Sequence, residues 1–561
     1  MKDIDYQKLE FAQSPMPTTA GGRHGVVVVG AGPVGLSMAL DMAQRGHRVI
    51  LLDDDCRLSA GSRAICFAKR TLDIWDRLGV GQAMVDKGVS WNVGKVFFKN
   101  DPVWSFDLLP ETGHRRPAFI NLQQYYCEGY LYEAAAREDN IDLRWRHKVI
   151  GVTRESTHVV ITVETPDGCY TLSADWLIAC DGARSPLRKM LGLENQGRVF
   201  RDRFLIADVK MQADFPSERW FWFDPPFHPN QSVLLHRQPD NVWRIDFQLG
   251  WDADPLEEVK PEKVMPRIQT LLGPDARFEL EWVSVYTFAC ERMHTFRHDR
   301  ILFAGDAAHR VSPFGARGAN SGVQDADNLA WKLDLVMRGL APTSLIDTYC
   351  QEREFAAEEN IRHSSRSTDF ITPKSEISLL FRNMTLRLAK DYEFARKLVN
   401  SGRLSTATSY AQSALNTPDG DAFSPALPVG APAPDAPISV QGDRRWWLGQ
   451  LGAGFVIAVF CPRHPPGAQA LRDLARLQED PLAPKALLVL GKTLDPDGID
   501  THGLARVHDV DGVAHVRYDA RDHTTYLVRP DQHIAARWRG IDPDAILAAL
   551  RRATRAADEG N

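Results

Sequence analysis

The stretch GVVVVGAGPVG at positions 25–35 decides the fold class of this chain. The four valines ahead of Gly30 predict a strand that is buried on both faces. Gly30, Gly32 and Gly35 have the spacing of a turn whose backbone approaches a pyrophosphate and whose helix packs closely on the strand. The positive end of that helix then faces the phosphates. The stretch therefore predicts the start of a nucleotide-binding β-α-β unit.

The residues after this loop complete the unit. A largely apolar segment at 36–46 predicts a helix, and the run at 48–53 predicts a second buried strand that ends in Asp53. A carboxylate at this place accepts hydrogen bonds from ribose hydroxyls. The glycine spacing alone is also compatible with a simple turn, but the acid and both strands favour dinucleotide binding. Asp54 and Asp55 are interpreted as solvated loop charges, and either one is an alternative to Asp53.

The bulk composition narrows the class of protein. A length of 561 residues predicts about two to four domains, and 44% hydrophobic with 25% charged residues is typical of a globular chain. The net charge of -6 argues against nucleic acid as a partner. No run approaches the about 20 apolar residues of a membrane helix, so we expect no membrane partner.

The cysteines and histidines argue against metal chemistry. The eight cysteines include no Cys-x-x-Cys pair, and the 17 histidines include no His-Glu-x-x-His pattern. We therefore predict no metal and no disulfide framework, which favours a reducing, cytoplasmic location. The polar N-terminal segment lacks the apolar core of a signal peptide, which agrees with that location.

Two later segments repeat the pattern of a strand followed by a polar turn. The first, ADWLIACDGARS at 174–185, carries Asp181 after a buried strand. The second, ILFAGDAAHRVSPFGARGANSG at 301–322, carries Gly305 and Asp306 ahead of a glycine-rich loop and a long helix. Taken alone, Asp181 is compatible with a turn residue and Asp306 with a helix cap.

With these three motifs in this order, the sequence resembles the class A flavoprotein aromatic hydroxylases, which include phenol, p-hydroxybenzoate and 3-(3-hydroxyphenyl)propionate hydroxylases. The resemblance covers residues 24–400. It implies FAD as cofactor and NADH or NADPH as co-substrate. The α/β fold it implies has a Rossmann-like FAD-binding domain, an inserted antiparallel-sheet substrate domain and a C-terminal thioredoxin-like domain.

The same resemblance implies a reaction. A small phenolic or related aromatic substrate would be hydroxylated with molecular oxygen, through a C4a-hydroperoxide of the flavin. Baeyer–Villiger oxygenation, epoxidation and tailoring hydroxylation on the same scaffold are alternatives. A flavin-dependent halogenase and a non-catalytic FAD-binding protein are further alternatives, because fold alone does not settle function.

The resemblance also assigns site residues by motif. The implied FAD contacts are Gly30, Gly32, Gly35, Asp53, Arg63, Gln124, Asp181, Gly305, Asp306, Pro313, Gly315, Gly318 and Asn320. Gln124 and Asp306 would contact the ribityl chain, and Arg63 the phosphates or adenosine.

Three residues in the Gly305 segment are candidates for catalysis: Arg317, His309 and Pro313. Arg317 stands in a loop where the family often has Gly-Gln-Gly, and an arginine there stabilises anionic flavin or binds an anionic substrate. A solvent-facing surface arginine is the equal alternative. His309 is compatible with a purely structural histidine.

Alternating strands are expected between 200 and 295, for example at 204–210, 233–237 and 242–249. Most aromatic side chains in such a sheet are packing residues. Candidate substrate contacts are Trp222, His236, Arg244 and Asp246.

The expected domain boundaries follow from these segments. They are a flexible N-terminal tail at 1–22, an FAD-binding domain with a helical extension at 23–199 and 296–420, a substrate domain at 200–295, a stiff linker at 421–438 and a thioredoxin-like domain at 439–561. The linker carries five prolines. The last domain has Cys461 alone, so a structural or dimerisation role is expected, with a homodimer as the possible assembly.

Overall fold

The computed structural model describes residues 5–17, 21–59, 61, 63–213, 215–399 and 404–556. The chain divides into two compact units. The first contains Met1–Pro110, Arg116–Gln324 and Glu354–Thr406, and the second contains Glu111–Arg115, Asp325–Arg353 and Ala407–Asn561. Among the described residues, no helix is long and apolar enough to span a bilayer.

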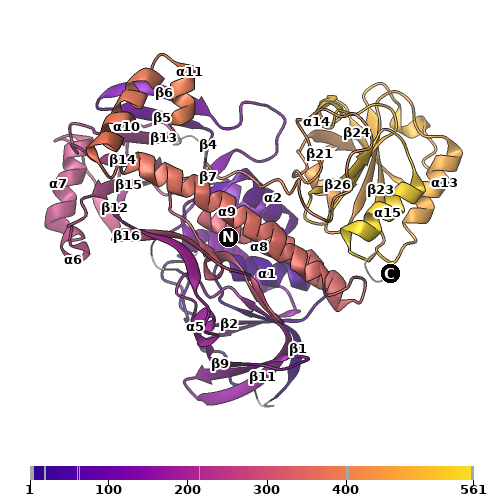
Figure 1. The fold of residues 1–561 in the computed structure, drawn as a ribbon, viewed down its shortest axis with the longest axis horizontal. Helices are drawn as coiled ribbons and strands as arrows, with labels where there is room; N and C mark the ends of the chain where they lie inside the picture. Colours follow the sequence, from indigo (N-terminus) through magenta and orange to yellow (C-terminus); the bar gives the residue numbers. More distant parts are fainter. Residues whose placement is uncertain are drawn as a thin grey trace. The chain divides into compact units, whose positions relative to one another are not determined.

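A mainly parallel sheet organises the nucleotide-binding part of the first unit (Figure 1). Its main path runs β17-β18-β11-β1-β2-β8, and β9 and β10 extend it through β11. The strands are β1 (Arg23–Val29), β2 (Val49–Asp53), β8 (Ile141–Trp145), β9 (Lys148–Arg154), β10 (Val159–Thr165), β11 (Gly168–Ala179), β17 (Arg297–His298) and β18 (Ile301–Phe303). Helix α1 (Pro33–Gln44) follows β1 and packs against α4 (Gln124–Ala135). The valines of β1 are buried, as expected for a central strand.

A second sheet of eight strands has the order β19-β16-β12-β15-β14-β13-β5-β6. Its strands are β5 (Val93–Phe98), β6 (Asp101–Asp107), β12 (Asn195–Lys210), β13 (Arg219–Phe223), β14 (Ser232–Arg237), β15 (Val242–Leu249), β16 (Glu279–Met293) and β19 (His309–Arg310). The range expected for the substrate domain, 200–295, was too narrow. Strand β5 pairs in parallel with β13, and β6 pairs with β5, so both belong to the same sheet. One face of this sheet is apolar and packs on Val264 and Ile268 of α7 (Pro261–Leu272).

The remaining elements between residues 66 and 398 are short strands and helices. They are β3 (Cys66–Ala68), α2 (Lys69–Arg77), α3 (Gly81–Lys87), β4 (Val89–Trp91), β7 (Phe119–Asn121), α5 (Pro186–Met190), α6 (Pro255–Glu258), η1 (Gly305–Ala307), α8 (Gly318–Met337), α9 (Leu345–Ile371), α10 (Glu376–Ala389) and α11 (Glu393–Leu398). Strands β3, β7 and β4 form a separate small antiparallel sheet.

The N-terminal segment differs from the flexible tail that the sequence suggested. Tyr6 and Phe11 are buried, and the Phe11 ring stacks on Trp145 with centroids 4.3 Å apart. The backbone N–H of Phe11 donates to the carbonyl of Cys56 at 2.7 Å. Aromatic burial therefore fixes residues 5–17 to the first unit, while 1–4 and 18–20 lie outside the described residues.

The second unit is built on a sheet with the order β21-β20-β24-β23-β22-β25-β26. Its elements are β20 (Pro437–Val440), β21 (Asp443–Trp446), α12 (Leu448–Leu451), β22 (Val456–Cys461), α13 (Ala468–Leu477), β23 (Lys485–Gly491), η3 (Pro496–Gly498), β24 (Ala505–Asp509), α14 (Val513–Arg517), β25 (Thr524–Val528), β26 (Ile534–Trp538) and α15 (Pro543–Ala553). Strands β22, β23 and β24 are parallel, β25 is antiparallel to β22, and β26 is antiparallel to β25. Alternate residues of these strands enter two separate apolar clusters.

The proline-rich segment at 421–438 is part of this second unit, not a free linker. Leu427, Val429, Ala431 and Ala433 alternate along it and are buried in one of the apolar clusters. The N–H of Ala433 donates to the carbonyl of Gln532 at 2.8 Å. Prolines are tolerated here because an edge segment leaves some backbone positions without a ladder partner.

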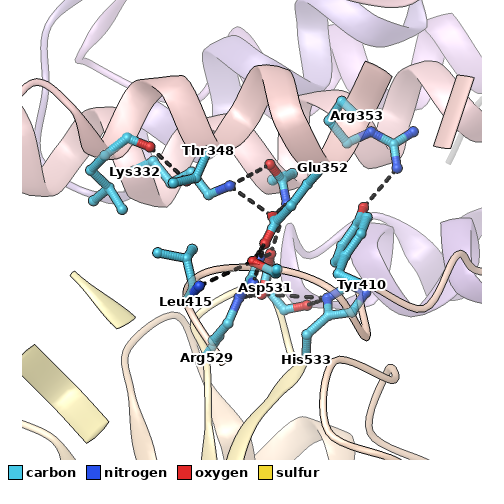
Figure 2. Close-up of polar contacts among 12 residues, drawn as sticks. Lys332, Thr348, Glu352, Arg353, Tyr410, Leu415, Arg529, Asp531 and His533 are labelled. Carbon is cyan, nitrogen blue, oxygen red and sulfur yellow. Dashed lines mark hydrogen bonds and ion pairs between the residues drawn. The ribbon is translucent and has the colours of Figure 1, made fainter. Parts of the chain in front are cut away.

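A buried ionic network joins α8, α9 and the residues after β25 within the second unit (Figure 2). Arg529 donates to both carboxylate oxygens of Glu352 at 2.6 and 2.8 Å, and to Asp531 at 3.0 and 2.6 Å. Lys332 donates to Glu352 at 2.8 Å and to Asn328 at 2.9 Å. The four charged side chains are at most 4% exposed. Two cations and two anions therefore balance inside the core.

The protonation states of this network follow from its geometry. Burial acts to raise the pKa of Glu352, but Arg529 and Lys332 outweigh it and hold that pKa below its ordinary value. Burial lowers the pKa of Lys332 to about 8. On the same two helices, Arg353 donates to Asp325 at 2.6 Å. Pairing keeps these buried groups charged near neutral pH.

Replacing Glu352 with glutamine will destabilise the second unit. The change leaves Arg529 and Lys332 with one carboxylate between them, and breaking a buried ion pair costs about 3–5 kcal/mol. Calorimetric and urea unfolding of the full chain measures the loss. As a control, Asp443→Asn removes an exposed pair with Arg445 at 3.0 Å. That control is expected to change the free energy of unfolding by less than about 1 kcal/mol. Equal losses in the two variants would contradict the importance of the buried network.

Candidate functional site

The three sequence motifs meet at one edge of the parallel sheet. Val29 is in register with both Leu52 and Ala179, and Ala179 is in register with Phe303. The loops that follow β1, β2, β11 and β18 therefore leave the sheet side by side. Carboxyl ends of parallel strands are the usual position of nucleotide sites in open α/β sheets. This edge is the candidate cofactor site.

The glycines of the first loop have different structural roles. Gly30 has a φ of +103°, and a Cβ built there would lie 2.4 Å from the carbonyl oxygen of Cys180. A Cβ on Gly35 would lie 1.8 Å from the carbonyl oxygen of Gly30. A Cβ on Gly32, in contrast, would have no atom of the described residues within 4 Å apart from its chain neighbours. Gly30 and Gly35 are therefore required by the fold, whereas Gly32 leaves space that a ligand can use.

Asp53 is held by the same loop. Its carboxylate accepts hydrogen bonds from the N–H groups of Ala31 at 2.5 Å and Asp55 at 2.9 Å. Burial raises the pKa of Asp53 to about 6, although both N–H groups act in the opposite direction. Asp54 and Asp55 are exposed. Among these three acids, Asp53 is therefore the one fixed at the edge of the sheet.

The loop after β18 packs against the first glycine loop. Gly305 has a φ of +62°, and a Cβ there would lie 3.0 Å from Cγ2 of Val34 in α1. A Cβ on Gly322 of α8 would lie 2.6 Å from the same atom. The N-terminal turns of α1 and α8 thus approach each other around Val34. Asp306 follows Gly305 in this loop and is exposed. Its carboxylate is therefore accessible to a ligand.

Asn320 ties this loop to β3. Its side-chain oxygen accepts from the N–H of Ala68 at 2.8 Å, and its amide donates to the carbonyl oxygens of Cys66 at 2.9 Å and Ala316 at 2.6 Å. Gly318, which begins α8, and Gly315, with a φ of +111°, belong to the same loop. Asn320 thus positions the loop backbone.

Gln124 fixes the loop that contains Arg63. Its Oε1 accepts from the N–H of Ala64 at 3.0 Å, and its Nε2 donates to Ser59 at 3.0 Å and Glu128 at 2.8 Å. Glu128 in turn accepts from the N–H of Ser59 at 2.6 Å. Arg63 itself is exposed. Gln124 holds the loop in this structure, and Arg63 is left accessible to an anion.

Asp181 has a capping role that the sequence left open. Its Oδ2 accepts from the N–H of Leu187 at 3.0 Å, beside the Ser185 cap of α5. A Cβ on Gly30 would lie 3.1 Å from the Cα of Asp181, so the residue is also at the cofactor edge. Burial raises the pKa of Asp181 above its ordinary value.

The three catalytic candidates differ in exposure. Arg317 is 2% exposed and lies behind Gly315, where a Cβ would be 3.1 Å from its Nε, so a solvent-facing position is wrong. His309 is 1% exposed, and its ring stacks on Phe296 with centroids 5.6 Å apart. That contact favours a structural role. Pro313 is exposed between buried neighbours. Of the three, only Pro313 is directly accessible.

A polar face of the second sheet forms the other part of the site. Asp208 pairs directly with Arg244, and Arg244 pairs directly with His236. Trp220 pairs with Leu235 in the antiparallel register of β13 and β14. The preceding residue, Arg219, therefore lies opposite His236 and belongs to the same row. Directly paired residues project from the same face of a sheet. Four polar side chains thus form one row across β12, β15, β14 and β13.

The charges in this row are only partly paired. Arg244 binds both oxygens of Asp208, at 2.8 and 2.9 Å. Burial, reinforced by Arg219 and Arg244, lowers the pKa of His236 well below its ordinary value. Asp246, one row further along β15, lies 3.8 Å from His236, and burial raises the pKa of Asp246 to about 6. His236 is therefore neutral near physiological pH.

The structure separates Trp222 from the other substrate candidates. Trp222 pairs with Val233, which pairs with Phe247, so these residues belong to the opposite face of the sheet. Its ring stacks on Phe97 with centroids 5.1 Å apart, within the apolar cluster. The interpretation of Trp222 as a substrate contact is wrong, because the period of two along β13 directs it into the core.

Several residues on or next to this face were not singled out from the sequence. They are Asp208 and Arg219 on the sheet itself, and Cys66 and Asn121 on β3 and β7 beside it. Cys66 Sγ donates to Asn121 at 3.1 Å and lies 4.0 Å from Nδ1 of His236. Only the pairing register, which no local pattern reports, brings them together. The alternation of side chains along β13 and β14, which places Arg219, Phe221 and His236 on one face, is the one sequence signal that could have identified Arg219.

The residues at the edge fit FAD. The open space at Gly32 suits a pyrophosphate, and the Asp53 carboxylate suits ribose hydroxyls. The exposed Asp306 and the N-terminus of α8 supply an acceptor and a positive dipole at the second loop.

Comparison with known proteins agrees with this site. The sequence pattern of a family described as "FAD binding domain" matches residues 23–364. The chain is 32% identical over 350 residues to "Probable NADH-specific resorcinol 4-hydroxylase" of Rhodococcus jostii (strain RHA1), covering 61% of this chain and 64% of that protein. It is 28% identical over 539 residues to "3-(3-hydroxy-phenyl)propionate/3-hydroxycinnamic acid hydroxylase 2" of Burkholderia vietnamiensis (strain G4 / LMG 22486), covering 94% and 96%.

Solved structures show the same fold. The flavin-dependent monooxygenase PieE, in complex with FAD and substrate, aligns with a TM-score of 0.76 at 21% identity and covers 95% of this chain and 100% of that one. The family match extends over more than half of the chain and contains every motif at the sheet edge. This chain belongs to the FAD binding domain family.

Proposed function

We propose that this protein is an FAD-dependent monooxygenase that consumes NADH or NADPH and hydroxylates a phenolic or related aromatic substrate. The observation that carries the proposal is the polar face of the second sheet, with Arg244, His236 and Asp246, joined through Cys66 to the Asn320 loop. The relatives named as resorcinol and hydroxyphenylpropionate hydroxylases support the same substrate class.

When bound, FAD supplies hydride acceptance from the nicotinamide and the activation of oxygen. Gly30, Gly32 and Asp53 would hold its adenosine end, and Asp306 would hold the ribityl chain. Pro313, Gly315 and Gly318 would line the flavin. Arg63 would contact the phosphates. The helix that begins at Gly318 presents its positive end to developing negative charge on the ring.

The polar face would orient the substrate and exclude water. Its side chains are fixed by strand pairing, so an aromatic ring held there keeps one orientation. Asp246 is the group best matched to accept the phenolic proton, because burial raises its pKa to about 6, closer to neutral pH than that of an ordinary carboxyl group. His236, held neutral by burial, supplies a second polar contact.

The second unit is proposed to be a thioredoxin-like domain without redox activity. Three parallel and two antiparallel strands with flanking helices support that class. Cys461 is fully buried, and burial raises the pKa of its thiol to about 12. A thiol in that state is a poor nucleophile, which favours a structural role.

Substrate-stimulated oxidation tests the function directly. The holoenzyme is mixed with NADH or NADPH and a panel of phenols and phenolic acids in air. We expect at least one phenol to accelerate nicotinamide oxidation and to gain one oxygen atom from labelled O2, detected by mass spectrometry. FAD that neither nicotinamide reduces with any aromatic compound would refute the monooxygenase. An ester or epoxide product would favour the alternative oxygenations, and a chlorinated product a halogenase.

Gly32→Ala will weaken FAD binding without unfolding the chain. The added methyl group meets no protein atom but occupies the space available to the pyrophosphate. We expect the dissociation constant of FAD, measured by fluorescence titration of the apoprotein, to rise by at least about tenfold. Gly250→Ala, at another glycine with open space, is the matched control. Unchanged FAD affinity would place the pyrophosphate elsewhere.

FAD affinity will fall as the pH drops through about 6. Burial raises the pKa of Asp53 to that value in the protein without FAD. Ribose hydroxyls donate to the carboxylate, so they favour its charged form; protons therefore compete with FAD below pH 6 but not above it. Titrations between pH 5 and 8 measure the slope. Asp53→Asn should remove this dependence, whereas Asp54→Asn should keep it. A wild-type affinity that stays flat across the range would argue against contact with Asp53.

A further inference from the structure

The polar face of the second sheet contains a buried cation that is not fully hydrogen-bonded. Arg219 is 7% exposed. Within the described residues, its Nε and Nη1 atoms have no hydrogen-bond partner, and both are shielded from solvent. The neighbouring Arg244, in contrast, binds both oxygens of Asp208. A buried cation without a partner is costly, so this position calls for a separate explanation.

The groups around Arg219 do not supply the missing hydrogen-bond acceptors. Cys66 and Asp246 are the groups whose charges act on it most strongly. Burial raises the pKa of the Cys66 thiol to about 11, so the sulfur is uncharged near neutral pH. His236, beside Arg219 in the same row, is neutral. Asp246 Oδ1 is itself buried without a hydrogen-bond partner among the described residues, so Asp246 and Arg219 do not satisfy each other.

The position of Arg219 connects it to the proposed reaction centre. Cys66 lies on β3, and its carbonyl oxygen accepts from Asn320 in the loop that begins α8. Its Sγ lies 4.0 Å from His236, next to Arg219 in the row. Strand β3 thus connects the Arg219 end of the polar face with the flavin loop.

We propose that Arg219 is the anchor for a carboxylate on the aromatic substrate. This inference rests on the proposed function and narrows it to phenolic acids. A guanidinium recognises a carboxylate through paired, charge-assisted hydrogen bonds, and the low polarity around Arg219 strengthens them.

Binding to the holoenzyme tests the assignment without requiring turnover. The probes are 3-(3-hydroxyphenyl)propionate and its primary amide, which have the same ring and length but differ in charge. Titration calorimetry in the absence of nicotinamide gives both dissociation constants. We expect the wild-type protein to bind the acid at least about tenfold more tightly than the amide, the lower range for hydrogen bonds to a charged group.

Arg219→Met should weaken binding of the acid by about tenfold to a hundredfold and leave the amide within about twofold. Arg219→Lys should retain part of the preference for the acid. Arg237→Met is the matched control, because Arg237 follows His236 on β14, belongs to the opposite face and lies over Trp243. It should leave both constants unchanged.

Thermal stability separates an anchor from a structural arginine. Removing an unpartnered buried cation should leave the melting temperature of Arg219→Met equal to or above that of the wild type. At equal concentration, the acid should raise the wild-type melting temperature more than the amide does. A destabilised Arg219→Met, equal loss for both probes, or a wild type that does not discriminate between them would overturn the proposal. Acid-selective binding without nicotinamide oxidation would retain the anchor and refute only the monooxygenase.

Discussion

Backbone hydrogen bonds hold β2, β1, β11 and β18 in parallel register, and the cofactor site depends on that register. Each strand ends at the same edge, so segments separated by long stretches of sequence supply adjacent loops. The contacts at this edge leave no room for a side chain at two positions, since Gly30 lies against the backbone of Cys180 and Gly35 lies against Gly30. A shift of one residue between β1 and β2 would separate the Asp53 carboxylate from the N–H of Ala31.

Buried charge is handled differently in the two units. In the second unit, Arg529, Lys332, Glu352 and Asp531 neutralise one another, and each has several hydrogen bonds. Such a closed network has nothing left for a ligand, which is consistent with a structural role. On the polar face of the first unit, the Asp208 and Arg244 pair is closed in the same way, but Arg219 and Asp246 retain unused atoms. Incomplete pairing is what distinguishes a recognition surface from a stabilising cluster.

Local periodicity predicted much of the fold. The expected strand at 242–249 is β15 (Val242–Leu249), and the expected helix at 36–46 overlaps α1 (Pro33–Gln44). Pairing partners were not predictable in the same way. The parallel pairing of β5 with β13 joins residues far apart in the chain and has no signature within either strand. The prolines at 421–438 indicated a linker between domains, whereas alternate apolar residues bury that segment in the core of the second unit.

The candidate site was predicted best where a motif carries its own chemistry, as at Gly30, Asp53 and Gly305. It was predicted least well on the second sheet, where composition suggests only that aromatic and polar residues are near one another. Arg219 and Trp222 are three positions apart on β13, yet Trp222 packs in the apolar core and Arg219 belongs to the polar face. One short strand therefore directs Trp222 into the apolar core and Arg219 onto the polar face. Since a strand has less freedom than a loop, the same pairing that buries Trp222 also fixes the direction of Arg219.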